Sequence, residues 1–395
     1  MTEEPRIRLV PVEAATDDGL GEAEAEPPLP RIAPEMTPLR ALEEAVLPAL
    51  TRAPCFVLFS GGRDSSVVLA VATRVARRDG LQLPVPMTHT FPAHPETDEL
   101  AWQRHVLEHL ALKEHVLQTF DESMNLLGPA VRASVRAHGA LAPAGTHLLA
   151  PSFEAARGGS VLTGVDGDGL FNGGNFGPPR AAIAKRRPTR RLPLSVARAT
   201  APRLLRERVE KMRGLPQASW LTPRAAEAYR TMLARQKATE PLRWDSYVAW
   251  FSRRRRLVAI RQAVQRLSAA HDVLTVQPLM DRRFLAAVAR HGGAFGWGTR
   301  ADALRALFGT LVPDEVLTRS SKAVFTRPYW GADVKEFARD WDGTGLPRGL
   351  VEPETLRKIW LSERPDARTG LLLHAAWAAS LPGGERPQLF DCRLE

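Results

Sequence analysis

The sequence contains very little cysteine: only Cys55 and Cys392 occur among its 395 residues. Two cysteines in a chain of this length exclude a disulfide framework and a cysteine-ligated zinc site. The sequence also lacks a run of 18 apolar residues, which a membrane-spanning helix would require. The acidic start, Met1–Glu4, lacks the basic and apolar stretches of a signal peptide. We therefore expect a cytoplasmic protein with no membrane association.

Two common phosphate-binding patterns are missing as well. The G-x-x-x-x-G-K-[ST] spacing of a Walker loop is absent, and so is the G-x-G-x-x-G pattern of a dinucleotide fold. We find no internal repeats. Hydrophobic residues make up 44% of the chain, enough to bury a sizeable core in two globular lobes or one large one.

Charge is distributed unevenly along the chain. The formal net charge is +10, but residues 1–36 contain nine acidic residues and three arginines, a balance of −6, so the remainder carries +16. A basic body can attract ATP, an acidic peptide, a carrier protein or nucleic acid. A solvated, arginine-rich surface is the simpler explanation. The basic runs at 185–191 and 253–256 are the candidates for nucleic-acid contact.

Strand and helix signals alternate between residues 37 and 175, which predicts an α/β core with a parallel sheet covered on both faces. The predicted strands are 55–59, 85–91, 115–118 and 160–164, and the predicted helices are 37–53, 67–78 and 98–110. The other predicted parts are a mostly disordered acidic arm at 1–36, a basic helical connector at 176–256 and a mainly helical C-terminal part at 257–395. Ligands on such sheets bind at the carboxyl ends of the strands.

The most informative stretch is the glycine-rich turn that follows the first predicted strand. Gly61 and Gly62 let the backbone approach a phosphate, and the free N–H groups of the next helix would face the anion. Asp64 suits this site if it holds Mg²⁺, which bridges to the phosphates. Hydroxyl donors come from Ser60, Ser65 and Ser66. The alternative is an ordinary glycine-containing turn with Asp64 as a helix N-cap.

A second glycine-rich acidic turn, residues 163–174, follows the fourth predicted strand. Asp64 and Asp168 would then lie at the ends of adjacent strands. Two carboxylates placed in this way can hold Mg²⁺ together with phosphate oxygens. The alternative, a surface turn rich in Asp and Gly, explains one such loop better than it explains two.

The stretch Ser-Gly-Gly-Arg-Asp-Ser at 60–65 resembles the pyrophosphate loop of the PP-loop ATP pyrophosphatases. Three further stretches, at 163–174, 277–284 and 304–325, resemble the asparagine synthetase branch of that family. The resemblance implies a Rossmann-like PP-loop core over residues 37–175 that cleaves ATP to AMP and pyrophosphate. It places adenine near Leu58 and Gly164, Mg²⁺ between Asp64 and Asp168, and the catalytic lysine of the family at Lys322.

The chain departs from this pattern at several positions. Val165 and Gly169 replace two glutamates of the branch, and Asp166, shifted by one position, is our candidate for the missing base. Asparagine synthetases begin with a glutaminase domain that has an N-terminal cysteine nucleophile, and no cysteine lies near Met1. We therefore expect the chain to use a preformed amine instead of ammonia derived from glutamine.

These observations predict an ATP-dependent ligase that adenylates a carboxylate and transfers the acyl group to an amine. We expect small-molecule or peptide substrates in specialised-metabolite or lasso-type macrolactam biosynthesis, and a partner protein or carrier stays open. One alternative is a PP-loop enzyme that modifies tRNA, which the two basic runs favour. Another is a degenerate relative that only binds a partner, which Val165 and Gly169 favour.

Overall fold

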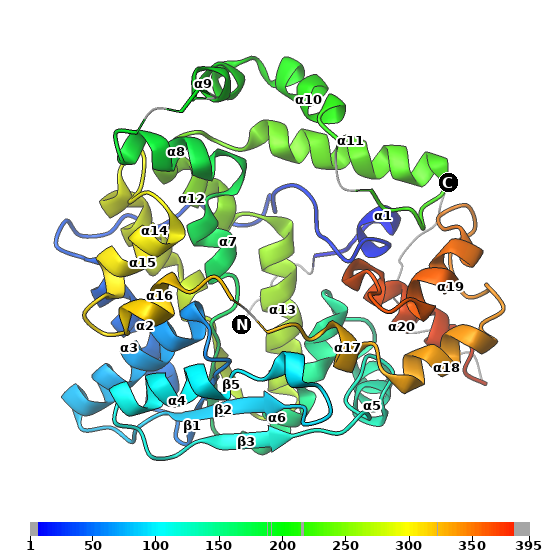
Figure 1. Cartoon of the computed structure of the whole chain (residues 1–395), viewed down its shortest axis with the longest axis horizontal. Helices are drawn as coiled ribbons and strands as arrows, with labels where there is room; N and C mark the ends of the chain where they lie inside the picture. Colours follow the sequence, from blue (N-terminus) through cyan, green and yellow to red (C-terminus); the bar gives the residue numbers. More distant parts are fainter. Residues whose placement is uncertain (1–6, 188, 191, 215–216, 322, 383–395) are drawn as a thin grey trace.

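A parallel sheet forms the base of the molecule in Figure 1. The computed structural model describes residues 7–382, except 188, 191, 215–216 and 322. Five strands pair in the order β3-β2-β1-β4-β5, all parallel. Their bounds are β1 (Cys55–Leu58), β2 (Val85–Thr90), β3 (Val116–Thr119), β4 (Ser160–Leu162) and β5 (Leu274–Val276). The α/β fold predicted from the sequence is confirmed.

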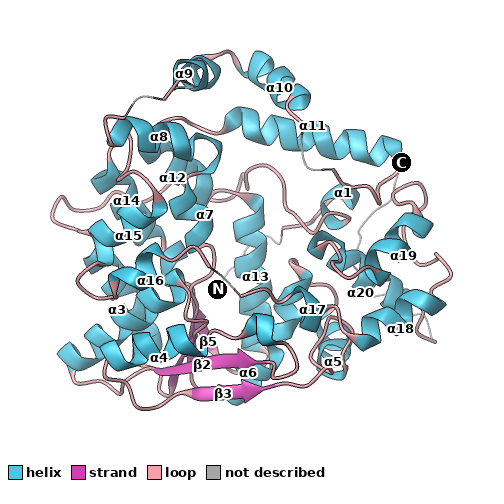
Figure 2. Cartoon of the chain, in the orientation of Figure 1, coloured by secondary structure: helices cyan, strands magenta, loops and turns pink. Residues whose placement is uncertain are grey.

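Helices surround this sheet and make up most of the rest of the chain (Figure 2). Between the first four strands lie α3 (Arg63–Asp79), α4 (Leu100–His109), α5 (Pro129–His138) and α6 (Ala150–Ala155), with the short turns η1 (Pro95–Thr97) and η2 (Ala144–Leu149); α1 (Pro11–Ala14) and α2 (Pro38–Leu50) precede them. Between β4 and β5 lie α7 (Gly167–Asn172), η3 (Gly174–Phe176), α8 (Gly177–Ala184), α9 (Leu192–Thr200), α10 (Arg203–Met212), α11 (Pro223–Thr239), α12 (Trp244–Ser252) and α13 (Arg255–Ala269). After β5 come η4 (Pro278–Met280), α14 (Arg282–Gly292), α15 (Arg300–Phe308), α16 (Asp314–Thr318), α17 (Thr326–Tyr329), α18 (Ala332–Asp340), α19 (Pro353–Leu361), η5 (Ala367–Thr369) and α20 (Gly370–Ala379). No helix in the described ranges is both long and apolar enough to cross a bilayer.

The first strand shows why the sheet is covered on both faces. Cys55 and Val57 join a core that includes residues of α2, α3 and α14, whereas Phe56 and Leu58 pack on the opposite side against residues of α6 and α13. This alternation follows from the period of two residues in a strand. A strand whose two faces are both buried must be apolar throughout, which is why β1 was recognisable from sequence.

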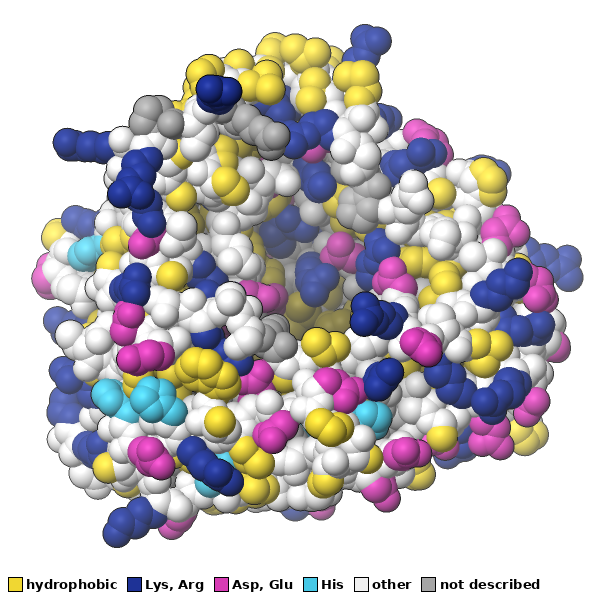
Figure 3. Space-filling view, viewed as in Figure 1, with side chains coloured by type: hydrophobic (Ala, Val, Ile, Leu, Met, Phe, Trp, Pro, Cys, Tyr) yellow, Lys and Arg dark blue, Asp and Glu magenta, His cyan; other side chains and the backbone are white. Residues whose placement is uncertain are grey.

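A second hydrophobic core, in a separate lobe, combines segments from residue 12 to residue 378. It joins residues of α5, α11, α18, α19 and α20 around fully buried side chains such as Trp220 and Trp360. Between this lobe and the sheet the molecule is hollowed at its centre, and Lys, Arg, Asp and Glu side chains line the hollow (Figure 3). In Figure 2 the arrows of β2 and β3 lie side by side along the lower part of the molecule and point toward the side that holds α5 and α17.

The N-terminal segment differs from our expectation of a mostly disordered arm. Residues 7–36 have a defined course along α13, with Ala15 and Leu20 buried. The backbone N–H of Ala23 donates to the carbonyl of Arg253 at 2.7 Å, and that of Arg255 donates to the carbonyl of Gly21 at 3.1 Å. Composition suggested disorder because it does not reveal that the acidic side chains have basic partners elsewhere in the chain.

Glu13 is the main anchor of this segment. Its buried carboxylate accepts hydrogen bonds from the backbone N–H groups of Val10 at 2.9 Å and Leu20 at 2.8 Å, and it forms an ion pair with Arg255 at 2.8 Å. The carboxylate thus connects the turn of α1, the following loop and α13.

Replacing Glu13 with Gln should destabilise the N-terminal segment by about 2 kcal/mol, because it removes the negative charge that pairs with the guanidinium of Arg255. Limited proteolysis within residues 7–36 should become faster, and urea unfolding should begin at a lower concentration. Glu24→Gln changes an exposed carboxylate of the same segment and serves as the control. Equal proteolysis rates in the two variants would show that the Glu13 contacts do not hold the segment.

Candidate active site

The phosphate loop predicted from the sequence connects β1 to α3. Gly62 is extended and caps α3, so the helix begins at Arg63, earlier than expected, and Asp64 lies in its first turn. Gly61 has a φ of +73°, and a Cβ atom there would lie 2.9 Å from Cγ of Gln103. Both the left-handed backbone and the close contact therefore require glycine at this position.

Serine side chains fix the course of this loop. The hydroxyl of Ser65 accepts from the N–H of Ser60 at 3.3 Å and donates to the carbonyl of Gly62 at 3.2 Å. The hydroxyl of Ser60 accepts from the N–H of Gly62 at 3.3 Å. Ser66 was also predicted to contact ATP, but its hydroxyl is buried and has no partner among the described residues. Its contact with ATP therefore stays a prediction.

The acidic loop after β4 lies directly against the phosphate loop. A Cβ atom on Gly164 would lie 2.7 Å from the backbone nitrogen of Ser65, and one on Gly167 would lie 2.6 Å from Cγ of Asp64. Because β1 and β4 are neighbours where the strand order reverses, their loops meet at the usual ligand crevice of such sheets. The sequence prediction that the two loops come together is confirmed. Leu58 is the last residue of β1, and Gly164 faces the first turn of α3.

Asp64 lies at the centre of this contact. Its Oδ2 atom accepts from Nη2 of Arg300 at 2.6 Å, and its Oδ1 atom is buried without a hydrogen-bond partner among the described residues. Burial raises the pKa of Asp64 and the nearby Asp168 raises it further, whereas Arg300 opposes the shift. An unsatisfied carboxylate oxygen in this setting is suited to a cation.

The residues present fit a magnesium ion that also binds a nucleotide. Asp168 lies in the first turn of α7 and accepts from the N–H of Gly169 at 3.0 Å. No group of three or more His, Cys, Asp or Glu side chains within the described ranges could hold a metal ion. Asp64 and Asp168 would therefore need phosphate oxygens to complete the coordination. A bound Mg²⁺ would offset the negative charge of the phosphates.

Two arginines to which the sequence analysis gave no role, Arg300 and Arg319, contact Asp64 and the phosphate loop. Arg319 is buried, pairs with Glu99 at 2.5 Å, donates to the carbonyl of Gly61 at 3.1 Å and lies 4.4 Å from the ring of Trp102. Its hydrogen bond to Gly61 holds the backbone of the phosphate loop in place. The resemblance included Arg319, but nothing in the sequence distinguished Arg300 from other arginines.

The loop after β4 also explains two departures from the family pattern. Val165 packs against the hydrophobic cluster that contains Phe153 and Val161, so this position holds an apolar side chain. A Cβ atom on Gly169 would lie 3.1 Å from the ring of Phe251. A glutamate at Gly169 would require this ring to move.

Asp166 is the remaining acidic side chain of the loop. Its φ of +61° is left-handed, a conformation that Asp tolerates better than most residues. Burial raises the pKa of Asp166 to about 6, while Arg256 opposes the shift. Arg256 in turn lies 3.5 Å from Asp18 of the N-terminal segment. In Figure 1, α7 and α13 lie near the middle of the molecule, below α10 and α11.

The four arginines at 253–256 form ion pairs or a cation–π contact with other residues of the chain. Arg253 pairs with Glu22 at 3.6 Å, and Arg254 lies 4.7 Å from the ring of Trp250. Arg255 and Arg256 pair with acidic residues of the N-terminal segment, as described above. These contacts weaken the case for this run as a nucleic-acid surface.

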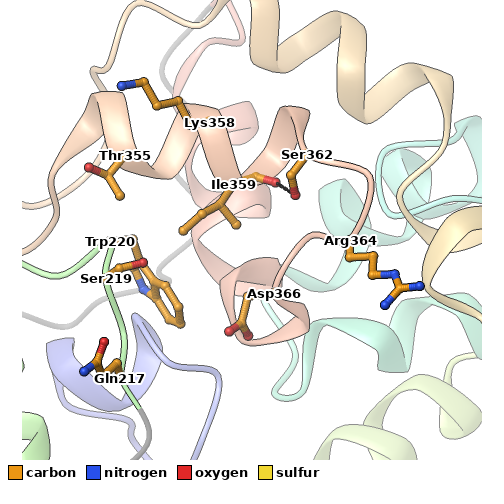
Figure 4. Close-up of a pocket in the computed structure, with 9 residues that line it drawn as sticks. All are labelled: Gln217, Ser219, Trp220, Thr355, Lys358, Ile359, Ser362, Arg364 and Asp366. Atoms are coloured by element: carbon orange, nitrogen blue, oxygen red, sulfur yellow. Dashed lines mark hydrogen bonds between the residues drawn. The ribbon is translucent and has the colours of Figure 1, made fainter.

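Lys322, the predicted catalytic lysine, falls outside the described residues. A shallow cavity of about 300 Å³ lies between α19 and the loop around Trp220, and its lining residues belong to neither glycine-rich loop. Lys358 and Arg364 at this cavity extend away from each other, so they do not form an anion site (Figure 4).

Comparison with known proteins shows the family to which the chain belongs. The sequence matches the asparagine synthase family over residues 39–380. The chain belongs to the asparagine synthase family. Among solved structures, NMN synthetase from Francisella tularensis matches with 15% identity and a TM-score of 0.24, over 35% of this chain and 59% of that one. The match thus spans less than two thirds of that synthetase. No match was found among curated proteins.

Replacing Asp64 with Asn should weaken the binding of MgATP by roughly 10- to 100-fold, because a charge-assisted contact to the cation is lost. Titration calorimetry with MgATP, and with ATP plus EDTA, shows how much of the affinity for ATP depends on the metal ion. Asp79→Asn, at the other end of α3, is the matched control. Unchanged MgATP affinity in Asp64→Asn would remove Asp64 from the metal site.

Proposed function

We propose that this asparagine synthase family member is an AMP-forming amide ligase. The family supports an ATP-dependent amidating ligase at a general level. The observation that carries the more specific proposal is the contact between the two glycine-rich loops, with the unsatisfied Oδ1 atom of Asp64 between them. We infer that adenine lies near Leu58 and Gly164 and that the phosphates lie over residues 60–66.

The proposed reaction has two steps. A substrate carboxylate attacks the α-phosphorus of ATP, and pyrophosphate leaves with the electrons of the broken P–O bond. An amine then attacks the acyl carbon, and AMP leaves. The loop N–H groups and Lys322 would stabilise negative charge in both steps, and the rigid loops would hold the reacting groups in line.

Asp166 is our candidate for the base that takes a proton from the amine. It lies beside the loop contact, and no glutamate is available at positions 165 and 169. A carboxylate with a raised pKa is a stronger base than an ordinary aspartate and is still ionised at neutral pH.

Substrates in specialised-metabolite or peptide biosynthesis, including lasso-type macrolactams, remain our proposal for this chain. The tRNA-modifying alternative loses support because the arginines at 253–256 are engaged within the molecule. The intact phosphate loop with Asp168 argues against a purely partner-binding relative.

A pool of small carboxylic acids and peptides should contain substrates that promote exchange of labelled pyrophosphate into ATP, because formation of the acyl-adenylate is reversible. Net turnover with an amine should release AMP. Asp64→Asn is the control that should abolish both signals. Formation of ADP and orthophosphate as the only products would contradict an adenylating enzyme.

Amide formation should rise with pH through about 6, since Asp166 is protonated below this value and ionised above it. Asp166→Asn keeps a side chain that tolerates the left-handed backbone and should lose this dependence, with amide synthesis falling about 10²-fold or more. Pyrophosphate exchange should be largely retained. If the variant keeps the same rise near pH 6, another group acts as the base.

A further inference from the structure

We propose that α9 and α10 form a docking surface for a partner protein that presents an acidic, amphipathic helix. The proposal rests on charge, on exposed apolar side chains and on the position of these helices beside the central hollow. It does not depend on the adenylation chemistry.

The charge of the whole protein is concentrated in this part of the chain. Residues 185–213 contain eleven Lys and Arg residues and two Glu residues, a balance of +9, whereas the net charge of the chain is +10. The other 366 residues therefore contribute only +1. A basic patch on an otherwise nearly neutral protein attracts an acidic partner and accelerates its association.

Some of these basic residues hold the helices in place. Arg206 donates to the carbonyl of Glu240, and its guanidinium lies 5.6 Å from the ring of Phe176. Arg198 lies 4.8 Å from the same ring and pairs with Glu210 at 3.5 Å. Glu207 pairs with Arg235 of α11 at 3.3 Å. These contacts fix one face of α10 on the body of the protein and leave the other face outward.

The outward face of α10 combines apolar and basic side chains. Leu204, Arg208 and Met212 follow one another at intervals of four residues and therefore form a line along the helix. Leu204 is 82% exposed and Met212 is 70% exposed. Arg208 is exposed and has no ion pair among the described residues. Leu205 and Lys211 flank this line, and both are also exposed.

The neighbouring helix extends this apolar surface. Leu194 of α9 is 74% exposed. Hydrophobic side chains gather along the top of the molecule, where α9 and α10 lie, above the central hollow (Figure 3). Leucine and methionine side chains gathered on a soluble surface mark an interaction site. A helix of ten residues is about 15 Å long, enough to contact three turns of a partner helix.

The arrangement of the face favours a protein over a membrane or a nucleic acid. An interfacial membrane helix separates a wide apolar face from its cations. Here Arg208 lies between Leu204 and Met212 at the middle of the face. The phosphate backbone of a nucleic acid would contact the arginines but would leave the leucines and the methionine exposed to solvent. An acidic helix with interspersed leucines satisfies both kinds of side chain.

The test uses the full-length protein and two fluorescent peptides of equal charge. One is a helical peptide with glutamates and leucines, and the other has serine in place of each leucine. The leucine peptide should bind at least ten-fold more tightly, because the apolar residues of α9 and α10 become buried. Anisotropy titrations at several salt concentrations, in parallel with phosphatidylserine vesicles and duplex RNA, compare the three classes of partner.

Two double variants assign the binding to α10. Arg203→Glu with Arg208→Glu, and separately Leu204→Ser with Met212→Ser, should each weaken binding of the leucine peptide about ten-fold or more. Arg104→Glu with Lys113→Glu makes the same charge change on exposed residues elsewhere and should have little effect. Circular dichroism and MgATP binding verify that each variant is folded.

Equal affinity for the two peptides, or equal loss in the Arg104/Lys113 control, would overturn the proposal. Tighter binding of the vesicles or of RNA than of the leucine peptide would also overturn it and would assign the surface to that class. Retained binding in the Leu204/Met212 variant would show that only charge is recognised.

Discussion

The contact around the carboxylate of Asp64 is the interaction on which the rest of the site depends. Asp64 lies in the first turn of α3, contacts the loop after β4 at Gly167, and pairs with Arg300 from the C-terminal part of the chain. Three distant segments therefore meet at one buried acidic group. Its ionised form requires compensation by a cation because burial disfavours the charge. Arg300 supplies part of this compensation, and the Oδ1 atom has no hydrogen-bond partner among the described residues.

A second set of charges connects the N-terminal segment to α13. The acidic residues of the N-terminal segment pair with arginines of α13 and its neighbours, as Glu26 does with Arg261 at 2.9 Å. This segment lies before residues 39–380, the part of the chain that matches the family. Through Asp18 and Arg256 it reaches the neighbourhood of Asp166. The same pairing leaves residues 185–213 as the main source of net positive charge.

The contact between the two loops could be predicted from local patterns, because strand, glycine turn and helix follow one another in the chain. The two loops and their aspartates were recognisable for this reason. Arg300 was not, because its role arises from the packing of α15 against the loops. Strand β5 was missed since three residues within a helical region carry too little pattern. The N-terminal segment was predicted as disordered because its partners lie more than 200 residues away.

The central claim is that a carboxylate oxygen becomes bonded to the α-phosphorus of ATP. A substrate that supports pyrophosphate exchange can be labelled with ¹⁸O in its carboxylate and incubated with enzyme, ATP and the amine. Mass spectrometry of the products then follows the label. The proposed mechanism predicts one ¹⁸O atom in each AMP, because the C–O bond breaks when the amine attacks the acyl carbon. AMP without the label, or label in orthophosphate, would contradict it.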